Sequence, residues 1–571
     1  MKHAPVTLRD VARRGEMAGP HRLPALCGAP STANGRTSTT NGSADATGAK
    51  TRELSPRTPG ATRGKHHLPS TSLRHLLAVS CLIATATSLR AQGDFDFDKI
   101  TPGTLGSTLS LQIRNANPNA FLLGMVSAGD GPTPLALIDP SDPRSLAVDP
   151  DLLGVWSVQL TSPTGTGSIS VAIPSGVAFQ GVVFYWQCAT LFGATTFFDE
   201  LSNPVTTQHV MPATSALLPY ALQAPRAAAN VVRTPNRNAG LGDFLLINGA
   251  TSEFFGFRDL NTQAGPAPIT PRALHGAATL NDGRLLMCGG LDGTGAVIAS
   301  CEIYDPVANT FTPAAPMLGL RAGHTAATLP DGRVMVVGGT TNFTDLTTAI
   351  TNALNTVELY TPATDTWAAA PVIGGRRLVP SLTRLNNGRM MIAGGIEVTI
   401  LFGIPIALTS TNKAQLYNPA TNSWSNAPNM PIGRAYHHDN QITLNDGRVL
   451  LSGGVLVPDL LGAANATSIA NADLYDPTTN SWTATTMSRQ RTGHAAAKLP
   501  DGTVIVCGGA EGLVSAAVTL DAIARFLPAT NTWSDLGAMT TTRVGHSAVV
   551  LPDGMLVILG GSGTTIEAME F

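Results

Sequence analysis

The sequence contains little charge and almost no excess of either sign. Asp, Glu, Lys and Arg make up 13% of the 571 residues, against about a quarter in typical soluble domains. The formal net charge is −2, so the charge balance does not indicate a nucleic-acid partner, and we expect none. Only six residues are lysine, which means that arginine carries nearly all of the positive charge.

Long apolar runs and common catalytic signatures are also missing. The apolar run Leu76–Ala86 is too short to span a bilayer, so we expect no transmembrane span. The chain has no G-x-S-x-G nucleophile elbow, no H-E-x-x-H zinc motif and no phosphate-binding loop. The usual sequence signatures of esterases, zinc proteases and nucleotide-binding proteins are therefore absent.

The N-terminal part of the chain has the features of an exported precursor. Residues 1–70 are rich in Arg, Ser, Thr, Gly and Pro without apolar periodicity, which predicts a disordered extension. Basic residues up to Arg74, the apolar run and the sequence SLRAQ predict a signal peptide at 71–91, cleaved after Ala91. A signal peptide stands near the start of a nascent chain, so we expect translation to begin after Met1. The expected location is periplasmic, cell-surface or secreted.

Residues 92–211 carry short apolar segments such as SLQIR, WSVQL and SISVAI between Pro-, Gly- and Asp-rich turns. This pattern predicts a small β-sandwich domain. The next segment, 212–260, is rich in Ala and Pro at its start and is interpreted as a linker. Within it, Asp243–Asp259 resembles two degenerate strands.

One phrase recurs down the rest of the chain. LPDGRVMVVGG (Leu329–Gly339) has five close copies, and their glycine pairs begin at 289, 338, 394, 453, 508 and 560. Asp-Gly or Asn-Gly between apolar runs predicts a tight hairpin turn. The apolar run that follows does not alternate, which is typical of a strand covered on both faces.

Each copy has the same neighbours. An Arg stands before the phrase, usually with a His three residues later, and a strand ending in Tyr-x-Pro and a Thr-Asn-x-Trp turn follow it. The unit therefore holds four strands and repeats every 49 to 59 residues, which predicts the blades of a β-propeller.

This unit resembles the Kelch repeat, in the bacterial form shared with the central domain of galactose oxidase. The resemblance covers Asn261–Phe571 and implies an all-β ring in which the first strand of each blade is innermost. The sixth copy stops before its fourth strand, and Asn261–Pro268 can supply it. We therefore expect a six-bladed Kelch-type β-propeller at 261–571, with seven blades as the alternative because of the strand-like Asp243–Asp259.

Strand direction places the Arg turns and the loops after the glycine pairs at the same end of the ring. These loops are longest in the middle copies, at Thr340–Asn355, Ile396–Asn412 and Val455–Asn471. Insertions concentrated on one face of a repeat protein usually mark its binding face.

The repeated Arg has two interpretations. A residue present in every copy suits an architectural role, such as bonding loop carbonyls between blades. Guanidinium groups around the rim would alternatively bind carboxylate or phosphate groups of an acidic ligand. The candidate ligand-binding residues are Arg272, Arg321, Arg377, Arg434, Arg491 and Arg543.

The other recurring polar residues favour packing. The repeated His is predicted to be a core residue rather than a ligand. Cys288 and Cys507 occupy a position that holds small or apolar residues in the other copies, so they too are predicted to be core thiols. Cys301 follows on the next strand, and a disulfide between Cys288 and Cys301 remains an alternative in an exported protein.

The fourth copy differs from the others because it reads RAYHHDN. Tyr436, His437, His438 and Asp439 are candidate catalytic residues, and the Tyr-His pair resembles the copper ligands of galactose oxidase. The second tyrosine that this enzyme needs is missing, because the matching positions hold Leu274, Gly323, Val379, Gly493 and Gly545. We therefore expect no copper and assign no metal or cofactor, with a different metal or an acid/base role for His437, His438 and Asp439 as the alternative.

The sequence favours an exported, monomeric binding module for a glycan or an extracytoplasmic protein, with a preference for acidic ligands. The alternative is a carbohydrate-active enzyme similar to N-acetylneuraminate epimerase, with a copper oxidase similar to galactose oxidase as a weaker one.

Overall fold

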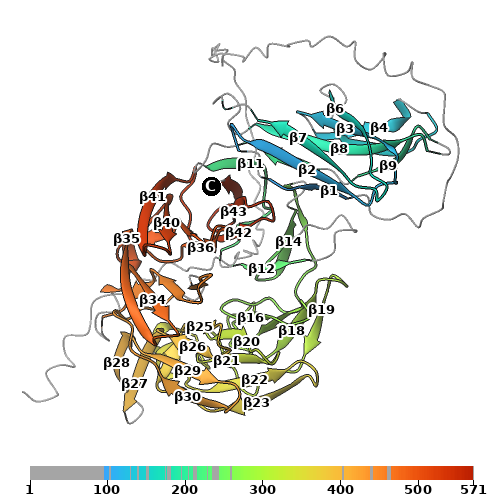
Figure 1. The fold of residues 1–571 in the computed structure, drawn as a ribbon. Helices are drawn as coiled ribbons and strands as arrows, with labels where there is room; N and C mark the ends of the chain where they lie inside the picture. Colours follow the sequence, from blue (N-terminus) through green and yellow to red (C-terminus); the bar gives the residue numbers. More distant parts are fainter. Residues whose placement is uncertain are drawn as a thin grey trace, which may run out of the picture. The chain divides into compact units, whose positions relative to one another are not determined.

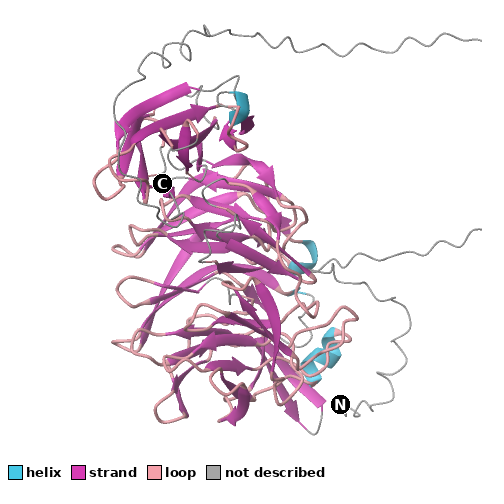
Figure 2. Ribbon diagram, turned by 90° about the vertical axis from the view of Figure 1, so that its right-hand side faces the viewer, coloured by secondary structure: helices cyan, strands magenta, loops and turns pink. Residues whose placement is uncertain are grey.

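The computed structural model describes residues 96–569, with gaps at 102–103, 129, 138–139, 149–153, 174, 176–181, 194–195, 203–204, 210–214, 228, 235–243, 257–259, 402–403, 437–440 and 459–464. The predicted extension (1–70) and signal peptide (71–91) lie outside the described residues. Strands dominate the part described (Figure 2), with one short α-helix, α1 (Leu346–Thr351), and two 3-10 turns, η2 (Leu135–Leu137) and η7 (Val514–Ala516). None of its helices has the length and apolarity needed to cross a membrane.

The N-terminal part forms two antiparallel sheets and a small hairpin. The first sheet has the order β1 (Asp96–Lys99), β2 (Thr108–Arg114), β7 (Gly167–Ala172). The second has the order β10 (Val205–Gln208), β8 (Val183–Leu191), β3 (Phe121–Ser127), β6 (Gly154–Leu160), with β9 (Phe198–Leu201) joined to β8. The hairpin pairs β4 (Asp130–Pro134) with β5 (Ser145–Val148).

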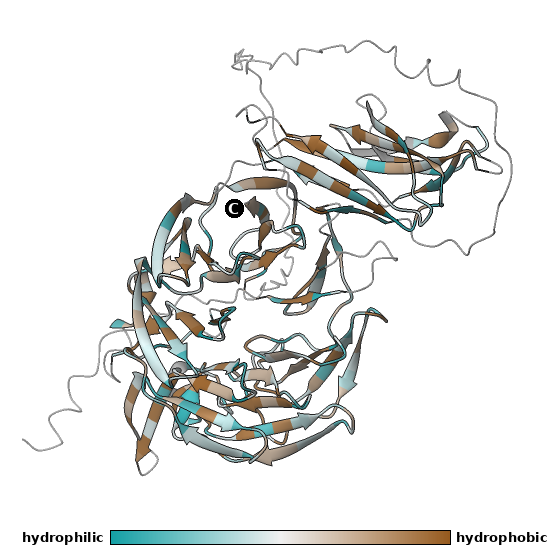
Figure 3. Cartoon of the chain, viewed as in Figure 1, coloured by the Kyte–Doolittle hydropathy of each residue, from teal (hydrophilic) through white to brown (hydrophobic). Residues whose placement is uncertain are grey.

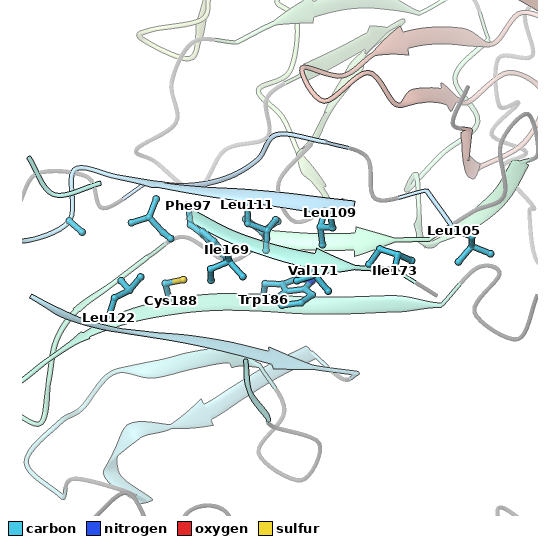
Figure 4. Close-up of a cluster of buried hydrophobic side chains, with 13 residues drawn as sticks. Phe97, Leu105, Leu109, Leu111, Leu122, Ile169, Val171, Ile173, Trp186 and Cys188 are labelled. Atoms are coloured by element: carbon cyan, nitrogen blue, oxygen red, sulfur yellow. The ribbon is translucent and has the colours of Figure 1, made fainter. Parts of the chain in front are cut away.

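A single hydrophobic core lies between these two sheets, as Figure 4 shows. Side chains alternate along β2, so that Leu109, Leu111 and Ile113 are buried while their neighbours face outward. Trp186 and Cys188 face them from β8. This alternation buries one face of the first sheet, as period-2 patterning requires. The second sheet is covered on both faces, because Leu123, Met125 and Ala189 belong to a further core with Leu135 and Leu146.

In the described residues seven further antiparallel sheets of this size follow, and six of them are built from strands close together in the sequence. In chain order their strands are β12 (Asn230–Arg233), β13 (Phe244–Asn248), β14 (Thr251–Phe255), β15 (Thr262–Ala264); β16 (Gly276–Thr279), β17 (Leu285–Cys288), β18 (Cys301–Asp305), β19 (Thr310–Ala314); β20 (Thr325–Thr328), β21 (Val334–Val337), β22 (Val357–Thr361), β23 (Thr366–Ala370); β25 (Ser381–Arg384), β26 (Met390–Ala393), β29 (Ala414–Asn418), β30 (Ser423–Asn426); β31 (Gln441–Thr443), β32 (Val449–Ser452), β34 (Thr467–Asp476), β35 (Ser481–Arg491), with β33 (Val455–Leu456) also on β34; β36 (Ala495–Lys498), β37 (Val504–Cys507), β40 (Ala522–Leu527), β41 (Thr532–Ala538); and β42 (Ser547–Val550), β43 (Leu556–Leu559), β44 (Thr565–Met569), completed by β11 (Ser215–Ala221).

Three small pairings lie between these strands in the sequence. β24 (Arg376–Leu378) pairs with β27 (Ile396–Leu401), β27 pairs with β28 (Ile404–Ser410), and β38 (Ala510–Glu511) pairs with β39 (Val518–Thr519). All of them belong to the regions around the glycine pairs.

Neighbouring sheets pack against one another in a ring. The second strand of each repeat, such as β21 or β37, is buried along its whole length, as its unbroken apolar run predicts. Every two consecutive sheets share a hydrophobic core, and a further core joins the last sheet to the first. Figure 1 shows the sheets following one another around a centre, with first strands such as β16, β20 and β36 nearest to it, and Figure 3 shows hydrophobic residues along them.

Our expectation of how the ring closes is wrong, whereas Asp243–Asp259 does hold two strands, β13 and β14. Thr262–Ala264 does not complete the last sheet, because it forms β15 and pairs with β14 in a sheet of its own. The last sheet instead takes β11, from the segment interpreted as a linker. Segment 212–260 thus supplies β11 and three strands of a further sheet, so the number of sheets matches the seven-blade alternative. The signal was weak because this segment has an Asn-Gly turn at Asn248–Gly249 but no Gly-Gly pair, and β11 depends on pairing and burial more than on intrinsic propensity.

Neighbouring leucines of β11 test this closure. Leu218 is 6% exposed and belongs to the core between the last and first sheets, whereas Leu217 is 43% exposed. We expect Leu218→Ser to lower the free energy of unfolding by about 3 kcal/mol and Leu217→Ser to change it by less than about 1 kcal/mol. Chemical denaturation of the two variants checks this, and equal effects would contradict closure by β11.

Candidate functional site

The Arg turns and the loops after the glycine pairs meet at one end of the ring. In five of the six repeats the residue after the Arg pairs with the residue after the glycine pair: Ala273 with Leu291, Ala322 with Thr340, Leu378 with Ile396, Ala435 with Val455, and Thr492 with Ala510. This confirms that the two kinds of loop share an end, which we call the loop face.

The six arginines of this face point into the sheets. Each is at most 2% exposed. In each one Nη1 donates to the carbonyl of the first glycine of its own glycine pair, at 2.9–3.4 Å. The carbonyl of the Arg accepts from the second glycine N–H of the preceding sheet, as in Gly290 N to Arg321 O at 2.8 Å. The side chains therefore stabilise the blade and its junction, and their burial argues against an exposed arginine rim.

A carboxylate that the sequence analysis missed completes this arrangement. It lies on the third strand, opposite the residue two before the glycine pair, as in Met287–Glu302 and Val336–Glu358. The ion pairs are Arg272–Glu302 (2.7 Å), Arg321–Glu358 (2.5 Å), Arg543–Glu567 (3.0 Å) and Arg434–Asp473. The signal in the sequence was an acidic residue two positions before the Tyr of Tyr-x-Pro.

The same carboxylate also binds the backbone. In three sheets its second oxygen accepts from the N–H three residues before the Arg: Ile269, Leu318 and Thr540, at 2.7–2.8 Å. In the repeat of Arg434 this position is Pro431, which has no N–H to donate. The acidic residue of that repeat, Asp473, is correspondingly shorter and does not have to reach this position. The carboxylate thus ties the Arg, the turn before it and the third strand together.

Two sheets lack this carboxylate. Gln415 replaces it beside Arg377, and Ala524 replaces it beside Arg491. Burial lowers the pKa of Arg377 to about 10, and Glu397 partly offsets this. Burial likewise lowers the pKa of Arg491. These are the two positions at which the repeat departs from its own pattern.

Arg226 is a seventh member that the sequence analysis did not recognise. It is 3% exposed, pairs with Glu253 at 3.0 Å, and its carbonyl accepts from Gly561 N at 3.1 Å. Its sheet has no glycine pair, so Nη1 donates to Thr251 O instead. In the sequence, Arg226 could have been recognised by its spacing from a carboxylate on the third strand of the same sheet.

The repeated histidines touch the preceding sheet. His324, His494 and His546 are nearly fully buried. Their Nε2 atoms lie 3.7 Å from Cys288 Sγ, 2.9 Å from Ser452 Oγ and 3.5 Å from Cys507 Sγ, respectively.

His275 is half-buried, and its Nε2 lies 2.6 Å from Asn230 Nδ2. Burial lowers the pKa of all four rings, to about 4 for His275 and about 3 for His546, and the nearby arginines lower it further. These neutral, packed rings suit a structural role.

The cysteines of the ring are buried thiols. Cys288 and Cys301 face each other in register on β17 and β18 and are not bonded to each other. The side chain of Cys301, together with burial, raises the pKa of Cys288 well above its usual value. Burial raises the pKa of Cys507 to about 12. Cys288 and Cys507 are therefore poor nucleophiles at neutral pH.

The residue between Arg and His is the variable feature of the loop face. Its backbone is left-handed in all six repeats: Leu274 (φ 52°), Gly323 (62°), Val379 (44°), Tyr436 (53°), Gly493 (59°) and Gly545 (68°). Left-handed backbone favours glycine and is strained for larger residues, most of all for a β-branched one. Three repeats nevertheless carry large side chains here, and Leu274 and Tyr436 are 37% and 38% exposed.

Of the candidate catalytic group, Tyr436 alone is described; His437, His438 and Asp439 lie outside the described residues. Within the described ranges, no cluster of three or more His, Cys, Asp or Glu side chains is arranged to hold a metal ion. The positions that would have to supply a second copper-binding tyrosine have the non-tyrosine residues named above, so this chain does not fit the galactose oxidase copper site.

Comparison with known families agrees with the repeat. A family model described as Kelch motif matches residues 271–318 and 321–371, the second and third of the seven sheets. The chain is a Kelch-repeat β-propeller protein.

Two curated relatives carry the same name. Kelch-like protein terF of Aspergillus terreus is 26% identical over 305 residues, which is 52% of this chain and 62% of that protein. Kelch-like protein 34 of Homo sapiens is 30% identical over 176 residues, which is 30% of this chain and 26% of that protein. The chain thus spans less than two thirds of either relative.

Two solved structures are similar to this chain at low identity. The structure of YjhT is 19% identical, with a TM-score of 0.38, and covers 52% of this chain and 94% of its own. A fungal alcohol oxidase of the AA5 family, in complex with copper, is 16% identical, with a TM-score of 0.45, and covers 62% of this chain and 75% of its own. At these values the likeness carries no information about activity.

The long loops of the middle Kelch repeats pack together on the loop face. A separate hydrophobic core joins Ile350 and Ala353 near α1, Leu378 of β24, Val398 and Leu408 of the β27–β28 hairpin, and Val455 and Val457 of the next loop, and Val379 packs against it. The Ile400–Leu408 segment is thus a hairpin, with Leu401 and Ile406 about half exposed. These insertions build a layer over part of the loop face.

Two open hollows lie beside this layer rather than at the centre of the ring. They have volumes of about 270 and 350 Å³, and both are lined by Glu397 and Lys413. These two side chains form an ion pair at 2.7 Å.

The lowered histidine pKa values predict a loss of stability in mild acid. A histidine whose pKa is lowered by folding takes up its proton more readily in the unfolded chain, so stability falls as pH drops from about 6.5 towards the folded pKa. For His546 the window runs from about 6.5 to about 3, and the loss by pH 5 is about 2 kcal/mol.

The variant His546→Asn cannot titrate in this range. We expect it to be less stable than the wild type at pH 7 but to lose about 2 kcal/mol less between pH 7 and pH 5. Urea denaturation at several pH values measures this difference. An unchanged pH dependence would show that His546 is charged or exposed in the folded protein.

Proposed function

We propose that the protein is an exported, monomeric binding module, in which a seven-bladed Kelch propeller follows a small β-sandwich and binds a glycan on its loop face. The ring count is supported by the seven sheets and by the core between the last and the first. The sandwich is supported by the core between the two N-terminal sheets. Export rests on the predicted signal peptide.

The observation that carries the proposal is the left-handed Tyr436. Three repeats avoid strain at this position with glycine, so a strained, exposed tyrosine is costly for folding unless it serves another purpose. Its side chain has an apolar ring face and a hydroxyl group, and many sugar-binding sites present this combination to their ligand. Leu274 and Val379 hold the equivalent position in two other sheets and extend the apolar character of this end.

The layer of long loops borders the proposed binding face on one side. The layer built from the long middle loops includes Ala435, the residue next to Tyr436, whereas the last loop of the ring, at 562–564, is short. A ligand on Tyr436 would therefore contact this layer. Because the arginines are buried, this proposal gives acidic ligands no preference.

A protein partner is the second candidate. Leu401 and Ile406 are 50% and 52% exposed near the tip of the β27–β28 hairpin. Exposed apolar side chains on a projecting hairpin suit a protein contact more than a sugar.

Binding is favoured over the epimerase alternative by the state of the described titratable groups. The pKa of His275, His324, His494 and His546 is lowered and that of Cys288 and Cys507 is raised, so these side chains stay uncharged and are poorly placed for acid–base chemistry on a bound sugar.

The variant Tyr436→Gly tests the proposal without disturbing the fold. Glycine removes the ring and relieves the left-handed strain, so we expect unchanged or higher thermal stability. Affinity for the best ligand from a glycan array should fall by about tenfold or more, equivalent to about 1.4 kcal/mol. Val307→Ser, a 70% exposed position in the turn between β18 and β19 at the opposite end of the ring, is the matched control.

Three outcomes can be told apart. Loss of binding in Tyr436→Gly alone supports a glycan site on the loop face. Binding that survives in Tyr436→Gly, or is lost equally in Val307→Ser, contradicts it. Hits on a parallel peptide array that vanish in Leu401→Ser with Ile406→Ser would favour the protein partner instead.

A further inference from the structure

The seven sheets provide internal comparisons for every position of the repeat. On the third strand, the position that pairs with the residue two before the glycine pair is Glu302, Glu358, Gln415, Asp473, Ala524 and Glu567 in successive repeats. Ala524 pairs with Val506 in this register. It is the single member of the set with no polar side chain.

Arg491 makes the same contact with the glycine-pair carbonyl as its equivalents, but it has no carboxylate partner. Its Nη1 donates to Gly508 O and Ala522 O, both at 3.1 Å. Its Nε and Nη2 are buried, and among the described residues they have no hydrogen-bond acceptor. In the equivalent Arg272 and Arg543, Nε donates to a carboxylate, whereas Nε also lacks an acceptor in the other three arginines. Nη2 distinguishes Arg491, because in each of the other five arginines it has an acceptor. A buried guanidinium without a counter-charge is strongly unfavourable.

The nearest acidic side chains are engaged elsewhere. Asp535 accepts a hydrogen bond from Ser488 Oγ, and Glu511 pairs with Arg489 at 2.7 Å. Asp535 and Glu511 raise the pKa of Arg491 only weakly against the effect of burial. Neither supplies the acceptors that Nε and Nη2 lack.

The size of the missing group is defined by the repeat itself. Replacing Glu by Ala removes one methylene and one carboxylate, which together correspond to acetate. Met487 stands four residues before Arg491, just as Met317 and Met539 stand before their arginines, and all three are buried. In this sheet Met487 packs with Val506 and Ala524 in a small hydrophobic core. Arg377 differs, since the full-length side chain of Gln415 occupies its equivalent position.

We propose that a small carboxylate anion, of formate or acetate size, binds between Arg491 and Ala524 and serves as the missing counter-ion of this sheet. Its oxygens accept hydrogen bonds from Nε and Nη2 of Arg491. The site is internal to the blade and distinct from the loop-face position of Tyr436. The bound anion replaces the carboxylate that an acidic side chain supplies at this position in other sheets.

Thermal unfolding of the full chain in acetate tests this. At constant pH and ionic strength, replacing chloride by acetate should raise the Tm of the wild type progressively, by about 2 °C at ten times the dissociation constant. The variant Ala524→Glu should have a higher Tm without acetate and no acetate response. Ala524→Asp, which introduces the shorter carboxylate that Asp473 provides in the preceding sheet, serves if the glutamate variant does not fold.

Gln415→Glu is the matched control. It restores a carboxylate beside Arg377 and should raise Tm, but it should leave the acetate response unchanged. A wild-type Tm that does not respond to acetate or formate would overturn the proposal and leave water as the partner of Arg491. An acetate response that persists in Ala524→Glu would also overturn it, because the anion would then bind elsewhere.

Discussion

The buried arginine–carboxylate pair is the interaction on which the ring depends. In one place it joins the turn before the first strand, the glycine pair that ends the second strand, and the third strand. Two buried charges are expensive to desolvate, and they become favourable only when further hydrogen bonds satisfy them. The glycine carbonyls and turn N–H groups supply those bonds, so a sheet that has the pair holds its loops through one polar centre inside an apolar blade.

This constraint separates structural from variable positions on the loop face. Arg and His are fixed by contacts within the ring, and the residue between them is fixed in backbone conformation but not in side chain. Gly323, Gly493 and Gly545 satisfy the left-handed backbone without strain, whereas Leu274, Val379 and Tyr436 do not. A repeat can therefore change its surface at this point without changing its architecture, which is why we place recognition there.

Much of the ring could be predicted from the sequence, because its signals are local. Asp-Gly turns, unbroken apolar runs and glycine pairs predicted the strands, and strand direction predicted the shared face of the Arg turns and long loops. The closing strand β11 could not be found in this way, because its partner β44 lies at the other end of the chain. The arginine partners were missed for a similar reason: Arg272 and Glu302 are 30 residues apart, and only cross-strand register brings them together. His437, His438 and Asp439 lie outside the described residues, so that part of the candidate site stays a prediction.

A double-mutant cycle between Arg321 and Glu358 tests the central role of the arginine–carboxylate pair most directly. The pair is 2.5 Å apart and nearly fully buried. The free energy of unfolding is measured for the wild type, Arg321→Met, Glu358→Leu and the double variant. We expect a coupling energy above about 2 kcal/mol, with each single variant costing about 3–5 kcal/mol and the double variant costing less than their sum. A coupling energy near zero would contradict the central role of the pair, because the two side chains would then act independently and the ring would depend on apolar packing alone.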